Sequence, residues 1–299
     1  MANPLVSSLP AYVDEHREEL YAKSILDSKS VRMFTLIPDV KGETDLHLVD
    51  TDVTLQDASD CGFNAAGTSE ISRRTLKPAY LKVNMEYCDK NLLKTYAAHN
   101  VRIAAGQKEL PYEAEFMDGI VNGINEKVEK MVWQGNSTAG DECDGLIKIL
   151  TDASAPSVTG GTSAYDKIKE VYMAMKEEVA SKEDAVIFVG AGLYRQFIQD
   201  LVAANLYHFD PSNSAEEYVL PATNVRVVKV NGLNDTTGFD YAVAGRLSNM
   251  FYGTDAMGDE NKLELWYSQD DRTFKVAVEF TISTQVAYPS EVVLGKWSK

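Results

Sequence analysis

The chain has 299 residues, of which 44% are hydrophobic, and it carries a formal net charge of −16. This apolar content supports a sizeable core and excludes global disorder, and the length allows one large domain or two average ones. The acidic excess disfavours nonspecific binding to nucleic acid or to anionic membranes, although it is equally consistent with simple solubility.

No segment predicts a membrane span, because the longest apolar stretches, such as residues 185–193, fall well short of about 20 residues. The first residues lack a basic region followed by an apolar stretch, so we expect no secretory signal and a cytoplasmic origin. The three cysteines, Cys61, Cys88 and Cys143, are widely spaced and form no C-x-x-C pair. We therefore expect reduced thiols, with no disulfide framework and no zinc knuckle.

The first 90 residues predict an arm followed by a long hairpin. The arm contains one helix near Val13 to Leu26, with Asp14 and Glu15 in its first turn. From Val31 the segment VRMFTLIPDV favours a strand. In residues 41–87, LHLVDTDVTL and LKPAYLKVNMEY flank a centre rich in Gly, Ala, Asn and Ser, which predicts two strands and a flexible tip. Because an isolated two-stranded ribbon is only marginally stable, we expect it to pack against the rest of the chain or against another subunit.

The strongest predicted helix spans Tyr112 to Gln134, after a short helix over residues 88–99. Its apolar residues recur at spacings of one, three and four and share one face: Phe116, Met117, Ile120, Val121, Ile124, Val128, Met131 and Val132. Glu126, Glu129 and Lys130 are assigned to the opposite, polar face. Pro111 suits the start, and Gly135 suits a left-handed residue that ends the helix. Such a helix is a rod of about 35 Å.

The remaining chain predicts mixed and then mostly β structure. GLIKIL, residues 145–150, favours a strand, and residues 151–163 a flexible connection that marks a boundary. Helices are expected over 164–180 and 193–204, around a strand at 185–189. Further strands are expected in EYVLP and VRVVKV, and the last sixty residues are expected to be all β with one irregular excursion.

The loop after the predicted long helix has a residue pattern that metal-binding loops and nucleophile elbows also show. With Gly145 as the sixth residue of a calcium loop, positions one and twelve are Gly140 and Thr151, which cannot supply the expected carboxylates. Around Ser137, Ala139 stands where a nucleophile elbow requires glycine, and the segment follows a helix instead of a strand. Both chemistries are therefore disfavoured, and Asp141, Glu142 and Asp144 are expected to be solvated loop charges.

A second candidate site resembles a dinucleotide-binding fingerprint. A strand leads into Gly190 and Gly192, then into a helix, with Asp210 twenty residues after Gly190. Arg195 occupies the third glycine position, where its bulk opposes close packing of helix on strand. A strand turning tightly into an amphipathic helix is the favoured interpretation.

No other residues in the sequence indicate a catalytic role. The four histidines, His16, His47, His99 and His208, share no spacing that places two on one helix face. Trp133, Trp266 and Trp297 are expected to be core or interface anchors. We therefore predict no catalytic, cofactor-binding or metal-binding residues and no cofactor.

The order of an arm, a long hairpin, a long amphipathic helix, an α/β segment and a β-rich return resembles the major capsid proteins of tailed bacteriophages, which have the Hong Kong 97-type fold. Residues 31–87 match the first strand and extended loop, and Tyr112 to Gln134 matches the spine helix. WQGNSTAGDECDGLIKIL is similar to the family's helix end and Gly-Leu strand, and AVIFVGAGLYRQF to its axial strand and helix. YAVAGRLSNMFYGTD and VAYPSEVVLG resemble its closing segments.

The resemblance implies an α+β fold with five parts. These are an N-terminal arm (1–30), a first strand and extended loop (31–90), a peripheral domain with the spine helix (91–155), an axial domain (156–245) and a return through the peripheral sheet (246–299). The arm is too short for the scaffolding segment of some family members, which implies a separate scaffold or none. The set of lysine, asparagine and glutamate that cross-links one branch has no match.

The function implied is a structural protein and not an enzyme. Its copies would form hexamers and pentamers of an icosahedral phage head that encloses double-stranded DNA, with scaffold, portal and decoration proteins as further partners and no membrane. It would be assembled in the bacterial host cytoplasm and found in the virion. An encapsulin-type bacterial compartment and a nucleotide-dependent oxidoreductase using Gly190 and Gly192 are the alternatives.

Overall fold

The protein is a mixed α and β chain in a computed structural model that describes residues 5–57, 66–105, 111–140, 143–206, 216–221, 223–234, 236, 238–255 and 263–298. The helices are α1 (Leu5–Leu26), α2 (Lys29–Met33), α3 (Asp89–Ala104), α4 (Tyr112–Gln134), α5 (Leu146–Asp152), α6 (Ala164–Ala174), α7 (Glu177–Ala180) and α8 (Ala191–Ala203). The strands are β1 (Thr35–Ile37), β2 (Thr44–Asp52), β3 (Thr68–Leu76), β4 (Ala79–Cys88), β5 (Ser157–Val158), β6 (Ala185–Gly190), β7 (Glu217–Val219), β8 (Arg226–Val230), β9 (Phe239–Arg246), β10 (Met250–Thr254), β11 (Leu263–Ser268), β12 (Thr273–Val286) and β13 (Val293–Ser298).

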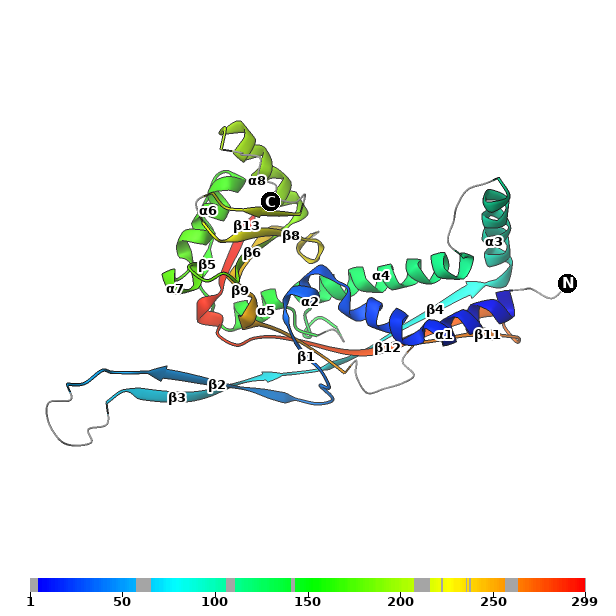
Figure 1. Ribbon diagram of the computed structural model, residues 1–299, viewed down its shortest axis with the longest axis horizontal. Coiled ribbons are helices and arrows are strands. Elements are labelled where there is room, and N and C mark those ends of the chain that lie inside the picture. The colour runs from blue at the N-terminus through cyan, green and yellow to red at the C-terminus, as the bar shows by residue number, and fades with distance from the viewer. Residues whose placement is uncertain are drawn as a thin grey trace.

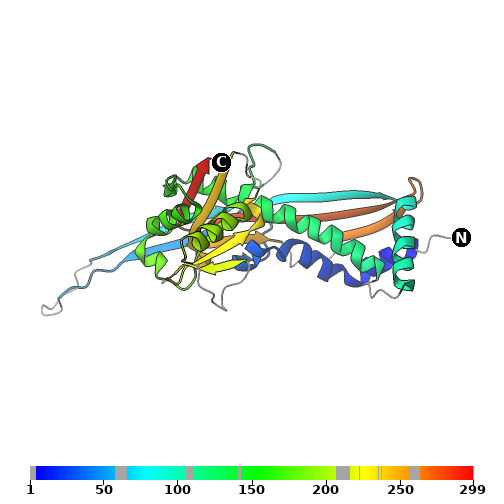
Figure 2. The same ribbon diagram turned by 90° about the horizontal axis from the view of Figure 1, so that it is seen from above.

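The first sheet has five strands in the order β1-β10-β12-β11, with β4 on the other edge of β12. β4 and β12 pair antiparallel from Ala79↔Ile282 to Cys88↔Thr273. The long helix α4 runs along this sheet with α1 beside it, and α1 also contacts β11 (Figures 1 and 2). Met117, Val121 and Val128 of α4 are almost fully buried in the resulting core, as the apolar periodicity predicts.

The second sheet has six strands in the order β5-β13-β9-β6-β8-β7. Its central strand β6 is buried along its whole length, in agreement with the continuous apolar run of its sequence. Helices α6 and α8 pack against one another on this sheet (Figure 1), and Phe197 of α8 is fully buried in their cluster. A short helical turn at Asn231–Leu233 joins this sheet to α4.

The hairpin of β2 and β3 forms a separate two-stranded sheet with pairs from Thr44↔Leu76 to Asp52↔Thr68. Figure 1 shows it reaching away from α4 and past the six-stranded sheet, while α3 stands at the opposite end of the long axis. The strand expected in LKPAYLKVNMEY is present from Ala79 as β4, but its expected place as the second strand of this hairpin was wrong. Lys77 and Pro78 interrupt the segment, so that β3 pairs with β2 and β4 joins β12.

Several other expected boundaries were also wrong. The arm helix begins at Leu5, so Asp14 and Glu15 lie inside it and not in its first turn. The strand was expected from Val31, but residues 31–33 belong to the helical turn α2, which leaves only three residues for β1. The helix expected over 164–180 divides into α6 and α7, because Met175 and Lys176 adopt extended backbone conformations.

GLIKIL was predicted to be a strand but forms helix α5, with Leu146 and Leu150 fully buried at a spacing of four. A short apolar run suits either structure, and here only the helical spacing brings both leucines into the core. Trp133 and Trp297 are buried as expected, whereas Trp266 is 42% exposed. Cys61, Asp141, Glu142, His208 and Asp210 lie outside the described residues.

Candidate assembly surfaces

The last two turns of α4 hold three parts of the chain together. Glu129, which the sequence pattern placed on the polar face, is 4% exposed. Its carboxylate accepts hydrogen bonds from the backbone N–H and the hydroxyl of Ser30, and Trp133 Nε1 donates to the same hydroxyl at 2.7 Å. Charge-assisted bonds to buried donors are among the stronger hydrogen bonds in proteins. The assignment of Glu129 to solvent was therefore wrong, because Ser30 is supplied by a distant segment.

The six-stranded sheet is joined to α4 through Gly232. A Cβ atom at Gly232 would lie 2.1 Å from Trp133 Cδ1 and 2.3 Å from the carbonyl oxygen of Glu129, so only glycine permits this approach. Gln134 Nε2 donates to the carbonyl oxygens of Gly232 and Asn234 at 2.6 and 2.7 Å. The end of α4 is thus a junction between Ser30 and the turn that leads to the six-stranded sheet.

The loop after α4 closes on itself through two glycines. Gly145 N–H donates to the Gly135 carbonyl at 2.9 Å, and a Cβ at either position would lie within 2.5 Å of the facing backbone. Gly135 has a φ of −53°, so the expected left-handed terminator was wrong. Glycine is required there by the close approach of the two backbones.

Asp144 organises this loop and is not a solvated charge, which corrects the sequence interpretation. Its Oδ1 accepts from the backbone N–H of Ser137 at 2.9 Å and from the Ser137 hydroxyl at 2.6 Å, and Lys148 Nζ lies 3.4 Å away. Partial burial acts to raise the pKa of Asp144, but the bonds from Ser137 and Lys148 outweigh it and lower the pKa. The described part of this loop is a structural turn.

The β2–β3 hairpin carries an apolar face that the subunit does not cover. Val49 and Ile71 are cross-strand partners and are 58% and 76% exposed. Val53 and Leu55, which follow β2, are 73% and 94% exposed. Neighbouring apolar side chains on one exposed surface are typical of an interaction site.

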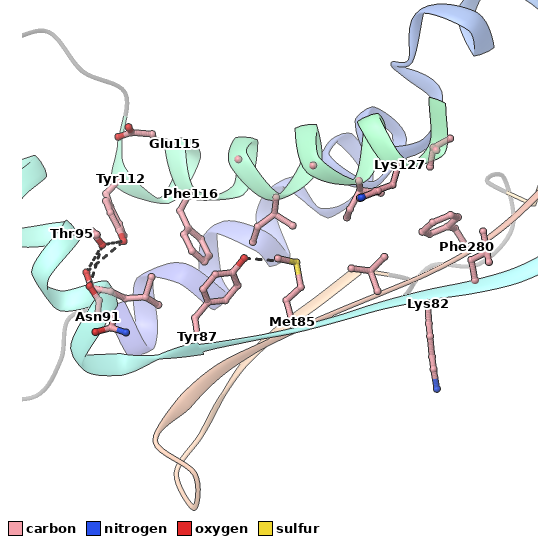
Figure 3. A pocket seen from close by; sticks show the side chains of 18 of the residues that line it. Lys82, Met85, Tyr87, Asn91, Thr95, Tyr112, Glu115, Phe116, Lys127 and Phe280 are labelled. Carbon is pink, nitrogen blue, oxygen red and sulfur yellow. Dashed lines mark hydrogen bonds between the residues drawn. The ribbon is translucent and has the colours of Figure 1, made fainter. Parts of the chain in front are cut away.

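A groove of about 1000 Å³ separates α4 from β4. Alternate residues of β4, from Leu81 to Tyr87, form its floor and are only partly buried. Phe116 of α4 projects into it toward Tyr87, as Figure 3 shows. The two rings meet edge to face, with their centroids 5.0 Å apart. The groove is predominantly apolar, which suits it to take up an apolar surface.

The segment at Gly190 and Ala191 packs against the turn at residues 231–234. The first N–H of α8, at Ala191, donates to Asn234 Oδ1 at 2.7 Å, so the turn is capped from within the chain. Gly190 lies against the carbonyl of Leu233, where a Cβ would come within 2.8 Å. β6 is parallel to β8 but antiparallel to β9, so the strand order does not continue as a dinucleotide-binding unit.

The predicted absence of catalytic and metal-binding residues stays a prediction. Among the described residues, no three His, Cys, Asp or Glu side chains are grouped to hold a metal ion. His99 is 2% exposed, with its Nε2 lying 3.7 Å from Glu115, and it anchors α3 to α4. In the part of the chain that the structure covers, no helix has the length and apolar character needed to cross a bilayer.

No protein-family model and no curated protein matches the sequence. Solved structures nevertheless match over nearly the whole chain. A structure of Gordonia phage Cozz is 15% identical, with 91% of this chain and 87% of that one covered and a TM-score of 0.60. The procapsid of satellite phage P4, described as including size determination (Sid) protein, is 11% identical, with coverages of 95% and 99% and a TM-score of 0.59. The capsid of an empty GTA particle is 13% identical, with coverages of 93% and 90% and a TM-score of 0.58.

Proposed function

We propose that this chain, which has the α+β, Hong Kong 97-type capsid fold expected from its sequence, is a major capsid protein whose copies form an icosahedral phage head. The observation that carries the proposal is the coverage of about nine-tenths of both chains in the structural matches.

The exposed surfaces support assembly on physical grounds. A two-stranded ribbon is only marginally stable in water, and this one presents Val49 and Ile71 to solvent. A neighbouring copy that covers this face would bury apolar area and stabilise the ribbon. Many such contacts, each weak, give a closed shell through multivalency.

Within this proposal the five parts of the sequence keep their expected roles, with residues 156–245 as the axial domain and 91–155 as the peripheral domain. The copies would form hexamers and pentamers around double-stranded DNA in the virion, after assembly in the host cytoplasm. Scaffold, portal and decoration proteins would be further partners. The net charge of −16 supports a shell that does not bind the packaged DNA tightly.

Negative-stain electron microscopy of the purified protein tests the proposal, together with light scattering to give particle mass. We expect closed, uniform shells. A monodisperse small particle at all concentrations and in the presence of phage head partners would refute it. Shells that contain a cargo enzyme and no genome would instead indicate an encapsulin-type compartment.

A further inference from the structure

We propose that helix α3 of one copy packs antiparallel along the glycine-bearing face of α4 in a second copy, over the mouth of the groove between α4 and β4. This inference rests on the proposed assembly and names a contact within it. It is carried by the exposure of α3, the open space over α4 and the unpaired charges on both helices.

Helix α3 presents one face that its own subunit leaves bare. Leu92 and His99 are buried against the subunit, whereas Lys94, Ala97 and Val101 are exposed. The last three recur at spacings of three and four, which places them on one helix face. Val101 is 68% exposed, an unusual position for a β-branched apolar side chain in an isolated subunit.

Helix α4 presents a complementary face beside the groove. Gly119, Gly123 and Glu126 are exposed, and they recur at spacings of four and three. A Cβ at Gly119 or Gly123 would meet no atom within 4 Å, so packing inside the subunit does not explain these glycines. Glycine weakens a helix interior relative to alanine, and here it leaves room for a second backbone to approach.

The two faces match in spacing and in charge when the helices run antiparallel. Lys94 then faces Glu126, Ala97 faces Gly123, and Val101 faces Gly119 beside the apolar lining at Phe116. Neither Lys94 nor Glu126 has an ion-pair partner within the described residues of its own chain. The contact would therefore pair two free charges, place a small residue against glycine and move Val101 from water into the groove.

The end of the molecule from which α3 projects is opposite the hairpin (Figure 1), so this contact and the hairpin contact use different surfaces. Figure 3 shows the groove between α4 and β4, with Phe116 of α4 directed toward Tyr87 on the floor formed by β4. The opening between α4 and β4 is the position that Val101 of the second copy would occupy.

Charge reversal tests the pairing. Lys94→Glu should reduce the yield of assembled particles at least ten-fold, and Glu126→Lys should do the same. The double variant Lys94→Glu/Glu126→Lys should restore assembly, because the pair is re-formed with opposite polarity. Lys90→Glu is the matched control, since in this register Lys90 faces Lys130 and its reversal should leave assembly unimpaired.

The glycine face gives a second readout. Gly119→Leu/Gly123→Leu should raise the melting temperature of the unassembled subunit, because helix propensity improves and a Cβ at either position meets no atom within 4 Å, yet it should abolish assembly. Zero-length carbodiimide cross-linking of mixed isotope-labelled and unlabelled wild-type particles should join Lys94 of one copy to Glu126 of another.

The outcomes separate this inference from the function on which it rests. If the wild-type chain forms no shells, the proposed function fails first. If it forms shells, and Lys94→Glu and the glycine variant assemble as well as wild type without any Lys94 to Glu126 cross-link, the α3 contact is refuted and the capsid function stands.

Discussion

The last turns of α4 bury a charged side chain, whereas the β2–β3 hairpin exposes apolar ones. At Glu129 and Trp133 each named polar group is paired with a partner inside the same chain. On the hairpin, Val49 and Ile71 are directed to solvent without cover from their own subunit. The first region secures the fold of one copy, and the second is suited to stabilise contacts between copies.

This difference separates two effects of mutation. A change at the α4 junction should lower the free energy of unfolding of a single subunit. A change on the hairpin should leave that quantity nearly constant and act on particle yield. Measuring both quantities for each variant shows whether the two regions are as distinct as their burial indicates.

Ile124→Asp should have the largest effect on the subunit. Ile124 is 4% exposed in the core of α4, and a buried unpaired carboxylate should destabilise the fold by more than about 4 kcal/mol. Soluble yield and circular dichroism would report the loss. Asn122→Asp, on the exposed side of the same helix, is the control, and a normally melting Ile124→Asp protein would show that the buried face is misassigned.

Glu129→Ala should come next, at about 2–4 kcal/mol, because both Ser30 donors lose their acceptor in a buried site. Chemical denaturation of the unassembled subunit measures the difference. Lys130→Ala, one residue further along the helix and exposed, should stay within about 0.5 kcal/mol. Equal effects of the two substitutions would contradict the role of Glu129 as a junction.

Val49→Ser/Ile71→Ser should change subunit stability by less than about 0.5 kcal/mol, because both side chains are already exposed. Particle yield should fall strongly, as seen by microscopy and sedimentation. Ser72→Ala, on the other face of the same hairpin, serves as the control. Normal shells from the double variant would argue against the hairpin as an assembly surface.

The smallest effect concerns the turn after α4 and depends on pH. The lowered pKa of Asp144 means that folding favours its ionised form. The stability that this carboxylate adds is therefore present above its pKa in the unfolded chain, which is ~3.9. That contribution is lost as pH falls through the lower, folded pKa. Asp144 is partly exposed, so the gap in unfolding free energy between wild type and Asp144→Asn should be under about 1 kcal/mol at pH 7. The gap should close toward pH 3, and one that widens in acid would contradict this sign.

Local pattern alone predicted the elements that are long or continuous. The periodicity from Phe116 to Val132 located α4 to the residue, with Pro111 immediately before it. The run from Ala185 to Val189 located β6 because a fully buried strand has no polar positions. The order of these elements also carried the resemblance to a capsid fold, and the matched structures confirm that fold.

Pairing between distant segments could not be predicted in the same way. β3 and β4 are adjacent in sequence and both are extended, yet β3 pairs with β2 while β4 pairs with β12. Leu146 to Leu150 is too short for periodicity to distinguish a helix from a strand. The candidate surfaces were missed for the same reason, since the exposure of Val101 or Ile71 depends on what the rest of the chain covers.

The sequence by itself determined the long amphipathic helix, the buried central strand and the order of parts that indicates the fold, because periodicity and composition act locally. Only the tertiary structure decided the role of the segment from Met131 to Leu150. The sequence of this loop is similar to that of metal-binding loops, but the contact of Gly135 with Gly145 and the hydrogen bonds of Asp144 make it a closed turn at the end of α4. Burial and hydrogen bonding between residues far apart in sequence are properties of the folded chain, so no local pattern encodes them.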